Sequence, residues 1–193
     1  MPTVLNAREP KVRLPYHLWT VKEFHQMAAA GLLDETDRVE LVEGEMIDMA
    51  PIGSKHAFIV NQISQTFSAR VGGQCLVSTQ NPVRLGERSE PQPDVALLRS
   101  GNYMDALPAA ADVLLIVEVS DSTLEYDRDV KIELYARHGI PEVWLLDVNA
   151  REITVYREPV EGQYRLIRKP TAAEAVSSMA VPGVALRLME LMA

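Results

Sequence analysis

The amino-acid sequence predicts an α/β fold in which helices flank a mixed β-sheet. The first observation is the uninterrupted apolar run Val113–Val119, which is typical of a central strand covered on both faces. The second is the order strand, helix, strand over residues 113–148. The third is a series of short apolar segments bounded by turn residues, which indicates hairpins beside that unit.

Capping and turn residues set the bounds of the predicted elements. Thr20 and Glu23 form a capping box, and Gly31 and Gly139 are helix stops. Ser54 is placed to cap a second helix. In chain order we predict a helix over 20–30, a hairpin of 38–42 and 45–49, a helix over 54–71, strands over 74–80 and 82–85, a strand from 94, a loop over 99–111, a strand over 113–119, a helix over 124–138, a strand over 142–148, paired strands over 151–157 and 163–168, and a short strand or helix within 176–192.

The chain length of 193 residues predicts one domain. We place it at residues 20–193, after a lead-in of residues 1–19 that three prolines keep irregular. No apolar stretch approaches the roughly 18–20 residues that span a bilayer, and the N-terminus lacks a signal pattern. The single cysteine, Cys75, cannot form an internal disulfide, so we expect it to be buried in a strand and the protein to be cytoplasmic.

Three carboxylates stand in strands that are otherwise apolar. Asp94 opens one strand, and Glu118 nearly closes the central one. Glu40 lies between apolar neighbours in the first hairpin, which suggests a carboxylate in a setting like those of Asp94 and Glu118. The alternative is that Glu40 is a solvated glutamate on an edge strand. A buried carboxylate is costly unless it is paired, hydrogen-bonded or bound to a cation. Asp94 and Glu118, on strands that we expect to be neighbours, therefore indicate a shared cation.

The helix over 124–138 adds a lysine to this set. Asp127, Lys131, Tyr135 and His138 follow one another at intervals of four, four and three residues, so they lie along one helix face. In one interpretation Lys131 points at the carboxylates. In the other, Asp127 and Lys131 form an ordinary exposed ion pair, worth about 0.3–0.5 kcal/mol.

These residues resemble the core of the PD-(D/E)xK nucleases, with Pro93-Asp94 as the Pro-Asp pair and Glu118 as the acid. Ser120 stands where that motif has its lysine. The chain is more closely similar to the Uma-type restriction endonucleases, in which the lysine lies on the following helix, where Lys131 stands. The segments that carry this resemblance, between about Thr20 and Leu188, are 39–45, 93–95, 118–123, Lys131 with Tyr135, and 139–144.

The resemblance implies a restriction-endonuclease-like core and a nuclease that hydrolyses phosphodiester bonds. Asp94 and Glu118 offer the hard oxygen ligands that suit Mg²⁺ or Mn²⁺, and the carbonyl of Val119 could complete the site. Lys131 would orient or deprotonate the attacking water or balance the phosphate charge. Glu40 would hold a second cation or position Lys131. Residues expected around them are His56, Ser120, Asp127 and Tyr135.

Each supporting residue also has a plainer interpretation. His56 could be a simple surface histidine, and Tyr135 a half-buried aromatic on its helix. The charged residues of the paired strands could form a basic strip for nucleic acid or only a polar strand face. That strip comprises Arg151, Arg157, Arg165, Arg168 and Lys169.

DNA is the expected substrate. Because cutting both strands of a duplex usually needs two active sites, we also expect a homodimer. The net charge of −8 argues against broad, non-specific binding to nucleic acid, although a bound cation would supply positive charge locally. The alternatives are a nuclease-like binding or regulatory module without activity, and a related hydrolase acting on RNA or a nucleotide. No nucleotide-binding glycine loop or His- or Cys-rich metal motif competes with these.

Overall fold

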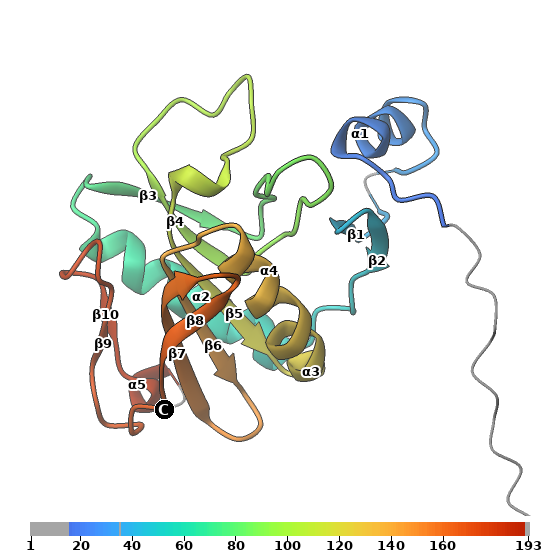
Figure 1. Cartoon of the computed structure of the whole chain (residues 1–193). Coiled ribbons are helices and arrows are strands. Elements are labelled where there is room, and N and C mark those ends of the chain that lie inside the picture. The colour runs from blue at the N-terminus through green and yellow to red at the C-terminus, as the bar shows by residue number, and fades with distance from the viewer. Residues whose placement is uncertain (1–15, 35, 192–193) are drawn as a thin grey trace, which may run out of the picture.

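The computed structural model describes residues 16–34 and 36–191 (Figure 1). Most of the predicted lead-in therefore lies outside the described residues, and the domain boundary at residue 20 stays a prediction. The elements are α1 (Val21–Ala29), β1 (Val39–Val42), β2 (Glu45–Asp48), α2 (Ser54–Arg70), β3 (Cys75–Thr79), β4 (Val95–Arg99), the 3₁₀ turn η1 (Ala110–Asp112), β5 (Val113–Ser120), α3 (Leu124–Tyr126), the π-helical turn η2 (Asp127–Lys131), α4 (Ile132–Arg137), β6 (Glu142–Asp147), β7 (Glu152–Val160), β8 (Gln163–Arg168), β9 (Val176–Ser177), β10 (Ala185–Leu186) and α5 (Leu188–Leu191).

The main sheet has six strands in the order β3-β4-β5-β6-β7-β8. Strands β5 and β6 are parallel, and every other neighbouring pair is antiparallel. Parallel strands need a long crossover connection, and here the segment of α3, η2 and α4 between β5 and β6 provides it. The predicted mixed sheet, with the apolar run of residues 113–119 in its interior, is confirmed.

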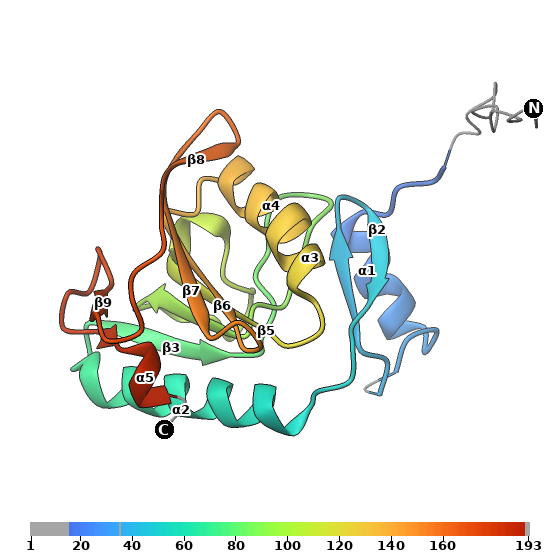
Figure 2. The ribbon, with the colours of Figure 1, turned by 90° about the horizontal axis from the view of Figure 1, so that it is seen from below.

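Helices cover both faces of this sheet (Figure 2). On one face α2 packs with the C-terminal segment over a core that includes Phe67 and Trp144, whose rings meet edge to face at 5.9 Å. On the other face α4 packs over Ile116 and Val143. Cys75 is buried in β3 beneath α2, as predicted. Alternation along β5 thus sends Glu118 toward the α4 side, the same side as Ile116.

The hairpin β1–β2 forms a separate two-stranded sheet beside the main one. Its two-residue turn, Glu43-Gly44, has φ values of 52° and 86°, as a type I′ turn requires. A Cβ at Gly44 would lie 2.7 Å from Cβ of Leu18, so only glycine fits there. The Glu90 N–H donates to the Leu41 carbonyl at 2.7 Å and fixes the hairpin against the loop before β4. The hairpin is thereby held beside the ends of β4 and β5.

Two local predictions are wrong. Residues 82–85 do not form a strand; within them Arg84 makes one isolated bridge to Ala109. Pro82 has no N–H to donate, and the N–H groups of the next three residues donate to loop carbonyls, those of Pro91, Pro108 and Ser89. Ser54 does not cap α2, because it is the first helical residue and the cap position is taken by Gly53, which offers no side chain. Among the described residues, no helix is long and apolar enough to cross a membrane.

Candidate active site

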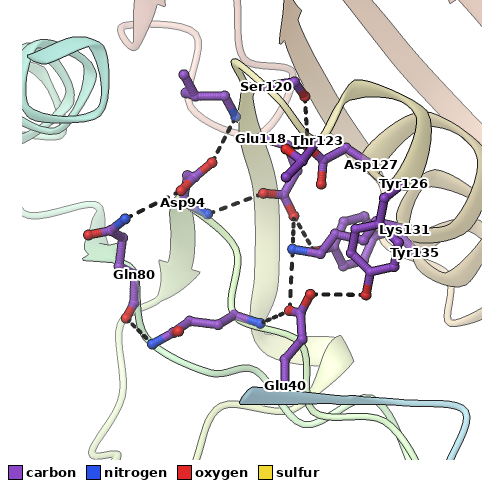
Figure 3. Close-up of polar contacts among 12 residues, drawn as sticks. Glu40, Gln80, Asp94, Glu118, Ser120, Thr123, Tyr126, Asp127, Lys131 and Tyr135 are labelled. Carbon is purple, nitrogen blue, oxygen red and sulfur yellow. Dashed lines mark hydrogen bonds and ion pairs between the residues drawn. The ribbon is translucent and has the colours of Figure 1, made fainter. Parts of the chain in front are cut away.

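A cavity of about 160 Å³ opens between the β1–β2 hairpin, the start of α2 and the ends of β4 and β5. Most of the side chains predicted to act together line it. They are Glu40, His56, Asp94, Glu118, Asp127 and Lys131. Ser120 and Tyr135 lie behind this lining and bond to it, and Figure 3 shows these contacts. His138 lies elsewhere, where its Nδ1 is 2.9 Å from the Leu134 carbonyl.

Asp94 is held from two directions at the start of β4. Its Oδ2 accepts the Val119 N–H at 2.9 Å, and its Oδ1 lies 3.0 Å from Nε2 of His56. The His56 side chain is only 16% exposed, so its interpretation as a surface histidine is wrong. Its hydrogen bond to Asp94 raises the pKa of His56, which favours the charged imidazolium beside the carboxylate.

Glu118 is almost completely buried, with 2% of its surface exposed. The Tyr135 hydroxyl donates to its Oε1 at 2.5 Å, and its Oε2 is 3.4 Å from the Asp94 N–H. Tyr135 is fully buried, so the half-buried alternative for this residue is wrong. Burial raises the pKa of Glu118 to about 8; Lys131 lowers it, and the nearby Asp94 raises it further.

Lys131 lies between two carboxylates at the base of the cavity. Its Nζ is 3.3 Å from Oε2 of Glu40 and 3.4 Å from Oε1 of Glu118. Burial disfavours the ammonium, but the charges of Glu118 and Glu40 outweigh that cost and raise the pKa of Lys131. The interpretation of Asp127 and Lys131 as an exposed ion pair is wrong, because both side chains are buried. Among the described residues, the ion pairs of Lys131 are with Glu40 and Glu118.

Glu40 is buried and has a protein partner on each oxygen. Oε2 accepts the Gln92 N–H at 2.9 Å, and Oε1 accepts the Tyr126 hydroxyl at 3.0 Å. The solvated alternative for Glu40 is therefore wrong, since only 2% of the residue is exposed. With these contacts Glu40 is arranged to hold Lys131 in place, the second of the two roles considered for it.

The sequence pattern does not single out Tyr126 or Gln92. The helix predicted over 124–138 is interrupted by η2, where the Ile132 N–H donates to the Asp127 carbonyl five residues earlier. A π-helical turn brings residues five apart onto one face, which α-helical spacing does not. Lys131 consequently lies over the Tyr126 ring, with Nζ 5.8 Å from its centroid. Nothing in the sequence pattern signals this turn.

Asp127 is bound by two hydroxyl groups. Ser120 and Thr123 donate to its Oδ2 at 2.7 and 2.6 Å. Burial raises the pKa of Asp127, while Lys131 and both hydroxyls lower it. Asp127 therefore links the end of β5 to η2, and so helps to fix where Lys131 and Glu118 stand relative to each other.

The proposed basic strip on β7 and β8 is largely neutralised. Arg157 pairs with Glu142 at 2.6 Å, and Lys169 pairs with Glu152 at 2.7 Å. Arg168 likewise pairs with Glu174. This favours the alternative, a polar face of two strands.

The high pKa of Glu118 predicts a specific pH dependence in metal-free protein. The ordinary pKa of 4.5 applies in the unfolded chain, so between pH 4.5 and 8 the folded state binds one proton more. Stability from this group should therefore fall as pH rises through that window, by up to about 1.4 kcal/mol per pH unit. Glu118→Gln should lack this fall. Urea unfolding in EDTA at pH 5.5 and 8.5 checks it; parallel losses in both proteins would contradict it.

The sheet order, the parallel β5–β6 crossover and the acidic cavity with its buried lysine define a protein of restriction-endonuclease-like fold. A solved structure supports that class: a "putative nuclease belonging to DUF820" from Anabaena variabilis ATCC 29413 matches with a TM-score of 0.71 and 18% identity, over 89% of this chain and 96% of that one. The model of the Uma2 family, described as "Putative restriction endonuclease", matches residues 21–189. The chain belongs to the Uma2 family. No curated protein matches it significantly.

Proposed function

We propose that this protein is a metal-dependent endonuclease that hydrolyses phosphodiester bonds of DNA. The observation that carries the proposal is the buried Lys131, set between Glu40 and Glu118 in the cavity that Asp94 also lines. A protein gains little stability from a buried ion pair of this kind, so its presence in a cavity favours a functional role. Membership of the Uma2 family supports the same reaction class.

The donor set fits a small hard cation. Among the described residues no cluster of three or more His, Cys, Asp or Glu is placed to hold a metal. Mg²⁺, however, is usually held by one or two carboxylates with water completing the shell. Asp94 and Glu118 would hold Mg²⁺ or Mn²⁺, with the Val119 carbonyl as a further ligand. When bound, the ion would neutralise phosphate charge and lower the pKa of a water molecule.

The protein's own residues would orient the reaction. Because the pKa of Lys131 is raised, its ammonium stays charged at neutral pH and is suited to orienting water and balancing phosphate charge, rather than to removing a proton. Tyr135 keeps Glu118 in position, and the Val119 N–H and His56 orient Asp94. Glu40 and Asp127 position the lysine and the end of β5. Of the three roles considered for Lys131, we therefore favour orienting the water and balancing phosphate charge over deprotonating the water.

Cleavage assays test this function directly. Supercoiled plasmid, duplex and single-stranded oligonucleotides and RNA are incubated with Mg²⁺, Mn²⁺ or EDTA, and Asp94→Asn serves as the inactive control. We expect DNA cleavage that needs the cation and is absent from the variant. Cleavage of RNA alone would support the RNA hydrolase, and failure to cut any substrate would support a binding module. Light scattering with and without DNA tests the proposed homodimer.

A further inference from the structure

The cavity poses an electrostatic problem for any phosphodiester. Its lining is rich in carboxylates, and a phosphodiester is itself an anion. The lining carboxylates are Glu40, Asp48, Asp94, Glu118, Asp121 and Asp127. Lys131 is engaged with Glu40 and Glu118, and His56 with Asp94. A substrate that enters therefore needs positive charge beyond these two side chains, which the proposed cation would supply in part and a further basic side chain would complete.

Arg38 is a lining cation with donors to spare. It lies one residue before β1 and is half-buried. The Met49 N–H donates to its carbonyl at 2.8 Å, so the ladder of the hairpin extends to Arg38. Arg38 and Glu40 are two residues apart on this extended segment and share a face. The strand that directs Glu40 into the cavity thus directs Arg38 toward it as well.

Among the described residues, a hydrogen bond orients the guanidinium of Arg38 and no carboxylate neutralises it. Its Nη1 donates at 3.0 Å to the carbonyl of Ala50, which also lines the cavity, so this bond holds the group at the cavity wall. Within the described residues Arg38 forms no ion pair, and that bond to Ala50 is its one side-chain hydrogen bond. A guanidinium has five N–H donors in a planar fork, so donors remain for a ligand. That fork matches two oxygens of one phosphate group.

We propose that Arg38 is a phosphate-binding residue, which contacts the non-bridging oxygens of the phosphodiester bound in this cavity. This proposal rests on the proposed function, and it identifies a residue that offsets the negative charge of the same site when a phosphodiester binds. Arg38 would act on substrate affinity, and Lys131 on the water and the reacting phosphate.

The test compares two arginines that each donate one side-chain hydrogen bond to a backbone carbonyl, one of them lining the cavity and the other exposed outside it. Arg38→Gln removes the charge but keeps a donor for the Ala50 carbonyl, and Arg38→Lys keeps the charge but loses the fork. Arg99→Gln is the matched control, because Arg99 ends β4 and its Nε donates to the Ala111 carbonyl, also twelve residues away, at 3.0 Å. Two measurements are made: single-turnover cleavage of a duplex oligonucleotide in Mg²⁺ at increasing protein concentration, and fluorescence anisotropy of the same duplex in EDTA at increasing KCl.

Arg38→Gln should raise the half-saturating protein concentration at least about tenfold and reduce the slope of log affinity against log salt by about one. Arg38→Lys should retain the slope and lose part of the affinity, and Arg99→Gln should match wild type. If Arg38→Gln behaves as Arg99→Gln while wild type cuts, Arg38 is not the phosphate-binding residue and the nuclease stands. Binding that depends on Arg38 without any cleavage would support this site and overturn the nuclease. Wild type that neither binds nor cuts overturns both.

Discussion

Replacing Lys131 with methionine should destabilise the metal-free protein by about 3–5 kcal/mol at pH 8. The lysine is 4% exposed, and its ammonium is the cation that faces Glu40 and Glu118. Methionine fills similar space but leaves both carboxylates in a low-dielectric site without their positive partner. Part of the cost is avoided at lower pH, where Glu118 can bind a proton. Urea unfolding at pH 6 and 8 in EDTA measures both effects.

Two controls distinguish the loss of a buried positive charge from the loss of any lysine side chain. Lys169→Met removes an exposed lysine from its pair with Glu152 and should change the unfolding midpoint little. The double variant Glu40→Gln/Lys131→Met removes a carboxylate together with its cation, so it should recover much of the lost stability. If Lys131→Met is as harmless as Lys169→Met, the folded protein tolerates Glu40 and Glu118 without their positive partner, and the expected cost is wrong.

The same substitution reports on catalysis if activity is measured where the variant is folded. Below its unfolding temperature, Lys131→Met should cleave at least about tenfold more slowly than wild type, which is about 1.4 kcal/mol of transition-state stabilisation. Lys131→Arg should recover little, because a planar guanidinium does not fit a site shaped for a compact ammonium. Single-turnover rates at saturating Mg²⁺ decide this, and equal rates in all three proteins would remove Lys131 from the reaction.

Elements set by local pattern were predictable from the sequence. The run of residues 113–119 can only be buried on both faces, and the capping box at Thr20 specifies where α1 begins. Asp94 and Glu118 could be predicted as site residues from the same local pattern, since they are acidic residues inside apolar strands. Because we expected their two strands to be neighbours, we also expected both side chains to reach one site. Strands β4 and β5 are indeed paired.

Features set by tertiary contacts were not predictable. Whether Lys131 was exposed or buried depended on where the β1–β2 hairpin docks, and neither periodicity nor spacing carries that information. The same docking buries Glu40 and brings the Tyr126 hydroxyl to it. The π-helical turn, which aligns Tyr126 with Lys131, has no signature in local propensity. Sequence spacing alone therefore favoured an exposed Asp127–Lys131 pair that the folded chain does not form.

Asp94→Asn and Asp127→Asn form a matched pair of variants that tests which carboxylate holds the metal. Each variant replaces a carboxylate that lines the same cavity by a neutral amide of similar size. Asp127 already accepts two hydroxyl donors on one oxygen, which suits a residue that positions its neighbours. Asp94 opens a strand beside Glu118, and together these two offer the hard oxygens that Mg²⁺ and Mn²⁺ select.

Asp94→Asn should abolish Mn²⁺ binding in calorimetry and lower cleavage by about 10³-fold or more, since an amide oxygen carries no charge to offset the cation's loss of hydration. Asp127→Asn should still bind Mn²⁺, with affinity or activity reduced by about 10–100-fold, as is typical when a residue that orients metal ligands is changed. Thermal melts in EDTA verify that each variant is folded. Equal loss of Mn²⁺ binding in both variants would make Asp127 a ligand, and undiminished binding in Asp94→Asn would place the cation elsewhere.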